Sequence, residues 1–178
     1  VIPARGPAAA LVPNLELGSW ELVGFDGVVF DWRDQTGYDD AFAALMQHLN
    51  ISSLAVEGQV MRVFVHHALK KAQPDLRIID AEREISAPRM IKTEAEVAAL
   101  QKAIDISERA LRATLDSVKL GQTEKEIEQK LVQMVFAEGA DDLSFAPIVA
   151  AGDGSARPHA KARENYRVKA GDAFILLL

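Results

Sequence analysis

The sequence predicts an α/β fold in its first half and an α+β fold in its second half. Up to Pro88, short apolar runs alternate with helical patterns at a spacing typical of βαβ units on a mostly parallel sheet. After Pro88 the pattern changes to long amphipathic helices followed by apolar strands. We therefore expect two domains, residues 1–88 and residues 89–178.

In the first domain, each element is predicted from its local pattern. Two helices are expected: 39–49, with Asp39 or Asp40 suited to the N-cap, and 60–72, which Pro74 ends. Strands are expected where apolar runs end at turn residues, namely at 8–12, 20–25, 53–56 and 76–79.

In the second domain, two capping boxes, Thr93-x-x-Glu96 and Thr123-x-x-Glu126, mark the starts of two helices. Gly121 is expected to end the first helix, and Gly139 occupies the C′ position of the second. Residues 144–151 and 173–178 are expected to be strands. The apolar positions expected to line one face of each helix are Val97, Leu100, Ile104, Leu111, Leu115 and Val118 in the first, and Ile127, Leu131, Met134 and Val135 in the second.

Composition excludes several classes of protein. The chain has 178 residues, 49% of them apolar and 26% charged, which is enough apolar material for a core. The net charge of −6 argues against binding to nucleic acid or to an anionic membrane. The sequence contains no cysteine, which excludes disulfides, thiolate zinc sites and cysteine nucleophiles. No apolar run is long enough to span a bilayer.

The two ends of the sequence predict a fragment of a longer chain. It begins at Val1 without a visible signal peptide, and it stops inside an apolar run, 173–178, that resembles a buried strand. We expect a cytoplasmic protein, although a missing start leaves a leader open.

His159 is the strongest candidate for chemistry. It lies in a loop directly after an apolar strand, and Pro158 fixes the backbone before it. An imidazole can donate or accept a proton near neutral pH, but one histidine is not a mechanism. From the residues alone, a functional role and a structural role stay equally open.

The other titratable groups favour structural roles. His48 lies near a helix end, and the adjacent His66 and His67 point about 100° apart on a helix, so we expect one to be partly buried and the other solvated. Asp141 and Asp142 are expected to be solvated. Glu124, Glu126 and Glu128, beside Lys125 and Lys130, predict a charged solvent face. We find no closed set of metal ligands.

The second half resembles the creatinase/prolidase-like metallopeptidases. The segment Arg89-Met90-Ile91-Lys92-Thr93-x-x-Glu96-Val97 is similar to the entry to their catalytic domain, and Lys119–Glu124 is similar to their K-P-G-x-T-E junction. Three further motifs follow in the family's order: a strand resembling L-S-F-x-P-I-V-A-x-G at 143–152, Pro158-His159, and a turn resembling L-K-x-G-D at 168–172. The first 88 residues resemble the family's N-terminal α/β domain more loosely.

The resemblance implies a small N-terminal βαβ domain followed by the first part of a pita-bread catalytic domain. It implies hydrolysis of Xaa-Pro peptide bonds, as in prolidase and aminopeptidase P, with two divalent ions (Mn²⁺, Co²⁺ or Zn²⁺) that activate water. It also implies a proline-containing peptide as substrate and a homodimer. His159 matches the family's active-site histidine, which contacts substrate and is not a metal ligand.

The sequence departs from the family where the first metal aspartate is expected. Leu177 and Leu178 occupy that region, so we assign no metal ligand in this chain and expect it to be inactive alone. Whether the aspartate is replaced or lies further on is open. Two alternatives remain: a metal-independent amidinohydrolase of the creatinase type, and a non-catalytic pita-bread module that binds protein.

Overall fold

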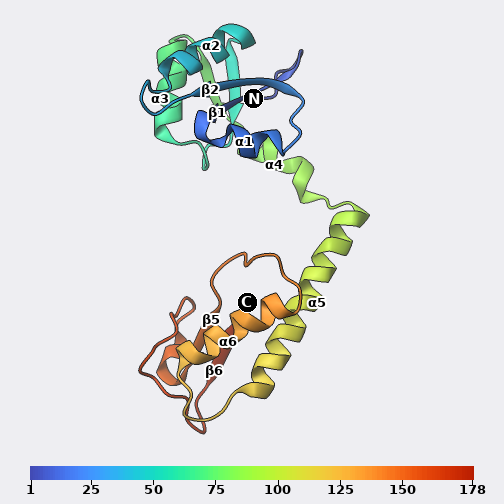
Figure 1. The fold of residues 1–178 in the computed structure, drawn as a ribbon, viewed down its shortest axis with the longest axis vertical. Coiled ribbons are helices and arrows are strands. Elements are labelled where there is room, and N and C mark those ends of the chain that lie inside the picture. Colours follow the sequence, from blue (N-terminus) through green and yellow to red (C-terminus); the bar gives the residue numbers. More distant parts are fainter. The chain divides into compact units, whose positions relative to one another are not determined.

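The computed structural model describes all residues, 1–178, and divides them into two compact units, Val1–Ile91 and Lys92–Leu178. Figure 1 shows the order of elements in each unit. The predicted boundary residue, Pro88, lies inside helix α4 (Glu82–Met90), the last element of the first unit. None of the helices has the length and apolar character that a bilayer crossing needs.

The first unit is built from two parallel strand pairs with helices between them. Strand β1 (Ala8–Pro13) pairs in parallel with β2 (Gly27–Trp32), and β3 (Ser53–Val56) pairs in parallel with β4 (Arg77–Asp80). The remaining elements are the short 3-10 helix η1 (Asn14–Glu16) and helices α1 (Leu17–Glu21), α2 (Asp39–Leu49), α3 (Val63–Ala72) and α4. The predicted βαβ organisation is confirmed.

The core of the first unit lies between helices α2 and α3. Phe42 and Met46 of α2 pack with Ala68 and Leu69 of α3 and with Leu76, and all of them are buried. The predicted helical spacing of α2 produces this contact because Phe42 and Met46 lie one turn apart. Lys71 of α3 donates to Asp39 of α2 at 2.6 Å across the exposed rim.

The second unit is α+β. Helix α5 (Glu94–Ser117) packs on α6 (Glu124–Ala137), and strand β5 (Ile148–Ala151) pairs antiparallel with β6 (Phe174–Leu177). A 3-10 helix, η2 (Gly152–Ala156), follows β5. Both capping boxes form, and Gly139 adopts φ +97° directly after the C-cap of α6, as predicted. The buried core consists of Ala110, Ile127, Leu131, Val135, Val149, Ala151 and Val168.

The predicted strand at 20–25 is wrong. Trp20 belongs to α1, and the partner of β1 is β2, which starts at Gly27 after the predicted turn. The stronger strand signal is Val28-Val29-Phe30, where β-branched and aromatic side chains follow one another. Leu22 and Val23 are 90% and 66% exposed, so the apolar run that suggested a strand has no buried partner.

The predicted apolar face of α5 is also wrong in part. Val97, Leu100, Ile104 and Leu115 are each about half exposed, at 54%, 52%, 49% and 51%. The buried side chains are instead Ile106, Ala110 and Thr114, which follow one another at intervals of four. Small residues on this line let α6 approach closely, so the contact with α6 selects the face rather than apolar periodicity along α5.

Other element bounds differ by a few residues. Helix α3 starts at Val63 rather than residue 60, and Tyr38 rather than Asp39 or Asp40 is the N-cap of α2. Helix α5 ends at Ser117, before Gly121, which occupies the following turn. Strand β5 covers only the second half of the predicted segment 144–151. Pro147 has no N–H to donate to a strand ladder, which agrees with the late start of β5.

Candidate active site

His159 lies on the segment that connects β5 to β6, and its side chain is exposed. It lines a cavity of about 710 Å³ in the second unit. Phe145 and Leu177 contribute apolar surface to this cavity, and Lys125, Glu128, Lys161 and Glu164 contribute charged groups. A cavity of this size, with mainly apolar walls and a few polar groups, suits a small organic ligand such as a short peptide.

Glu124 is buried next to the His159 segment, which corrects the predicted solvent face. Its side chain is 1% exposed, and both of its carboxylate oxygens accept hydrogen bonds. Oε1 accepts from the Ala151 amide at 2.7 Å and from Nη2 of Arg163 at 2.8 Å. Oε2 accepts from the Arg163 amide at 2.8 Å and from Nε of Arg163 at 2.9 Å.

Arg163 uses its remaining donors on the other end of the same segment. Nη1 donates to Asp153 at 2.9 Å, and Nη2 also donates to the carbonyl of Ala151 at 2.8 Å. The guanidinium carbon lies 3.9 Å from the centre of the Tyr166 ring. The planar fork of arginine is suited to this combination of paired carboxylate contacts and stacking.

The charged groups shift one another's pKa values in predictable directions. Burial alone would raise the pKa of Glu124, but the hydrogen bonds from Arg163 and from the amides of Ala151 and Arg163 lower it below the ordinary value. The hydrogen bonds to Glu124 and Asp153 raise the pKa of Arg163. The hydrogen bond from Arg163 also lowers the pKa of Asp153. All three groups therefore stay charged at neutral pH.

The sequence analysis did not single out Glu124 or Arg163. The signal for Glu124 was present, because Glu124, Ile127 and Leu131 share one helical face and the latter two are core residues. Glu126 is exposed, as predicted, and belongs to the capping box. Glu128 is not fully solvated, because its side chain is 15% exposed and forms an ion pair with Lys125. Arg163 carried no local signal, since its partner lies 39 residues away.

The other histidines do not join His159. His48 is exposed at the end of α2, with its ring 5.5 Å from that of Phe30, and His66 and His67 lie on α3 with ring centres 5.8 Å apart. Both His66 and His67 are exposed, so the prediction that one is partly buried is wrong. Asp141 and Asp142 are exposed, as predicted.

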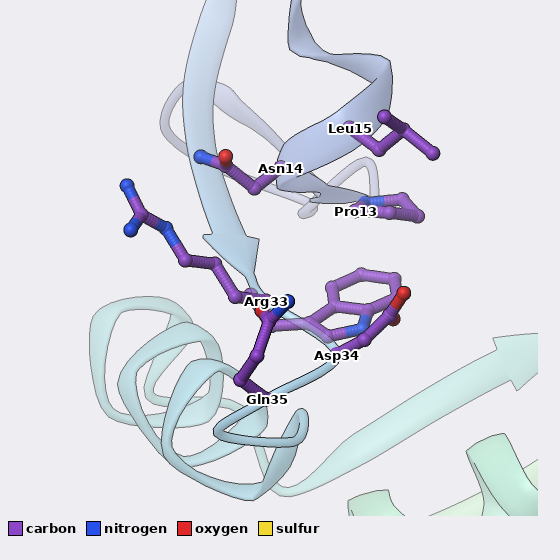
Figure 2. Close-up of a pocket in the computed structure, with 7 residues that line it drawn as sticks. Pro13, Asn14, Leu15, Arg33, Asp34 and Gln35 are labelled. Carbon is purple, nitrogen blue, oxygen red and sulfur yellow. The ribbon is translucent and has the colours of Figure 1, made fainter.

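A second cavity, of about 320 Å³, lies where the parallel strands β1 and β2 end (Figure 2). Figure 2 shows Pro13, Asn14 and Leu15 on the side of β1 and Arg33, Asp34 and Gln35 in the segment that follows β2. Asn14 donates to Asp31 at 2.7 Å. Arg33, Asp34 and Gln35 are exposed, and no histidine lines this cavity.

Both units match known families in chain order. Residues 1–91 match the creatinase/prolidase N-terminal domain, and residues 98–178 match metallopeptidase family M24. These matches agree with the observed fold, an α/β N-terminal unit followed by part of a pita-bread domain. The chain belongs to the creatinase/prolidase family, which confirms the predicted family and fold class.

The chain is similar to Xaa-Pro peptidases. It is 30% identical to an Xaa-Pro dipeptidase of Pyrococcus horikoshii over 71% of this chain and 35% of that protein. It is 36% identical to a probable Xaa-Pro aminopeptidase of Aspergillus niger over 70% of this chain and 27% of that protein. A prolidase structure from Thermococcus sibiricus is 29% identical and superposes with a TM-score of 0.86, covering 98% of this chain and 47% of that chain. The chain spans about a quarter to a half of the length of these relatives.

Membership of a metallopeptidase family implies divalent metal ions. In residues 1–178, however, no three His, Asp or Glu side chains gather closely enough to hold a metal ion. The end of β6 presents Leu177 and Leu178, which carry no ligand atoms. The residues of this chain therefore do not by themselves fit a dinuclear metal site.

Proposed function

We propose that the whole protein hydrolyses Xaa-Pro peptide bonds and that His159 contacts the substrate. The observation that carries the proposal is the position of His159 on a cavity of about 710 Å³. The Pro158-His159 motif, which resembles the motif of the family's active-site histidine, supports it. Phe145 and Ile148 offer apolar surface suited to a proline ring, and the His159 imidazole can donate a hydrogen bond to a substrate carbonyl or to a developing oxyanion.

The proposal extends to two divalent ions, Mn²⁺, Co²⁺ or Zn²⁺, in the whole protein. Its support is the match to family M24, and no ligand is assigned to residues 1–178. We also propose a homodimer in the cytoplasm. The resemblance supports the dimer, and the lack of cysteine is compatible with a reducing compartment. Light scattering and cell fractionation test these two points.

The function is tested on the whole protein with an Xaa-Pro dipeptide and added Mn²⁺. His159→Ala should lower kcat by about 10²–10³, the typical loss for one hydrogen-bond donor to a developing oxyanion. Metal content and thermal unfolding should stay unchanged, because His159 is exposed and outside the ligand set. His66→Ala, an exposed histidine on α3, is the matched control and should leave kcat unchanged.

Four results would contradict the proposal, each in a different way. A normal kcat in His159→Ala would make His159 a loop residue without a role in the reaction. Loss of metal in that variant would make it a ligand. Creatine turnover that resists a chelator, or tight peptide binding without cleavage, would replace Xaa-Pro hydrolysis by amidinohydrolysis or by a binding function.

A further inference from the structure

The segment that carries His159 is closed at its base by one buried carboxylate. The segment leaves β5 at Ala151, whose amide donates to Glu124, and it returns at Arg163, whose amide donates to the same carboxylate. The Arg163 side chain adds a bond to Asp153 near the start of the segment. Glu124 and Arg163 thus join the two ends of 152–162 to each other and to the first turn of α6.

Two further contacts hold the ends of this segment: the Gly152 amide donates to the Ala173 carbonyl at 2.9 Å, and Ala162 packs against the core. The residues between these ends have few contacts. The internal hydrogen bonds of the segment are short-range: Ser155 Oγ donates to the Gly152 carbonyl at 2.6 Å, and the amides of Arg157 and Ala160 donate to carbonyls three residues earlier at 3.1 and 3.2 Å. Between residues 155 and 161 no side chain is buried. A loop without a buried apolar anchor keeps its conformation mainly through contacts at its base.

The backbone at the base is shaped to receive the guanidinium. Gly154 is buried, and a Cβ atom there would lie 2.8 Å from Nη2 of Arg163 and 3.4 Å from Oε1 of Glu124. Its φ is not in the left-handed region, so the glycine serves the close approach of Arg163 rather than an unusual turn.

Stability alone is a weak reason for this arrangement. A buried ion pair loses much of its Coulomb energy to desolvation, and well-packed apolar side chains of similar volume are often as stabilising. An apolar pair could fill the same space, but it could not accept hydrogen bonds from the amides of Ala151 and Arg163, which both donate to the Glu124 carboxylate. The hydrogen bonds to Glu124 are directional, so they fix the orientation of the backbone at both ends of the loop.

We propose that Glu124 and Arg163 are positioning residues that hold the 152–162 segment in the conformation that presents His159 to the cavity. Neither residue lines the cavity, so in this proposal they act on the reaction only through His159. The inference rests on the proposed function in one respect, namely that His159 takes part in hydrolysis. That the pair orders the segment does not depend on it.

The ordering is tested on the 178-residue chain by amide hydrogen exchange. In Glu124→Gln, the Arg157 and Ala160 amides, neither of which bonds to Glu124, should exchange at least about tenfold faster, whereas the Leu131 amide in α6 should not change. Arg163→Lys keeps the charge but loses the paired contacts, and should give the same pattern if Glu124→Gln does not fold. Glu138→Gln removes a carboxylate from the exposed pair with Arg109 and should change none of the three exchange rates. Equal acceleration at all three amides, or none, would overturn the proposal.

The link to His159 is tested in the whole protein by a double-mutant cycle on an Xaa-Pro dipeptide. Glu124→Gln should lower kcat at least about tenfold with little change in KM, and should have almost no further effect in the His159→Ala background. Additive losses would overturn a role through His159. A protein inactive on every Xaa-Pro peptide would overturn the proposed function instead, while the exchange rates would still decide whether the pair orders the segment.

Discussion

Tyr166 connects the cluster formed by Glu124, Arg163 and Asp153 to the turn before β6. Its ring lies under the Arg163 guanidinium, and its hydroxyl lies 3.1 Å from each carboxylate oxygen of Asp172. Asp172 also accepts from the Lys169 amide at 2.9 Å, which closes the turn. Burial, and then the hydrogen bond to Asp172, raise the pKa of Tyr166, so its hydroxyl stays a donor at neutral pH.

Gly152 is required by the position of the Tyr166 hydroxyl. Its φ is +55°, and a Cβ atom there would lie 2.1 Å from that oxygen. Gly121, with φ +89° and no atom near its Cβ position, is a control for the backbone strain alone. Gly152→Ala should therefore lower the free energy of unfolding by about 1–3 kcal/mol more than Gly121→Ala, the usual cost of overpacking.

Urea unfolding of the two glycine variants measures this difference. Gly121 is a stringent control because its φ is at least as unfavourable for alanine. Equal losses in the two variants would show that the Tyr166 ring moves aside freely, and would argue against a rigid cluster around Arg163.

At the scale of elements, the two capping boxes differ mainly in burial. Thr93 and Thr123 each accept the amide of the residue three positions later, at 3.3 and 3.1 Å, and each donates its own amide to that glutamate, at 2.7 and 2.8 Å. Thr123 is only 6% exposed, whereas Thr93 is exposed. If the threonine hydroxyl is removed, the Glu96 amide at the start of α5 can therefore bond to water more easily than the Glu126 amide at the start of α6.

This difference predicts unequal costs for the same substitution. Thr123→Ala should lower the free energy of unfolding by about 1–2 kcal/mol, and Thr93→Ala by about 0.5–1 kcal/mol, the upper and lower parts of the range for N-caps. Both residues belong to the second unit, so one urea transition serves for the comparison. A larger loss in Thr93→Ala would contradict the argument from burial.

Elements set by local interactions were predictable from the sequence, and those set by distant contacts were not. The capping boxes of α5 and α6, the bounds of α2 and β3, and Gly139 after α6 depend on residues a few positions apart. The buried face of α5 depends on α6, and the burial of Glu124 depends on Arg163. His159 could be singled out from its motif, but its cavity could not, because Lys125 and Phe145 approach it only in the fold.

For the whole molecule, the carboxylates with lowered pKa values set the response to acid. The chain carries 26 acidic and 20 basic side chains, so it is net negative at neutral pH. Glu124, Asp153 and Glu96 each have a pKa below the ordinary value because the folded state donates hydrogen bonds to the ionised carboxylate. These bonds are available only in the folded chain, so the folded and unfolded states bind different numbers of protons in acid.

The free energy of unfolding should therefore be level near neutral pH and fall as the pH drops below the ordinary glutamate value of 4.5. In this range the unfolded chain binds protons that the folded chain still excludes, and acid therefore favours unfolding until the folded pKa is also passed. Glu124→Gln should lower the free energy of unfolding at pH 7 and make it fall less steeply in acid, that is, flatten the acid limb of the stability curve. Asp153→Asn should flatten it less, because that carboxylate is 70% exposed and solvent screens its pairing with Arg163. Urea unfolding from pH 7 to pH 3 measures both slopes, and an unchanged acid limb in Glu124→Gln would mean that this carboxylate is not held ionised by the fold.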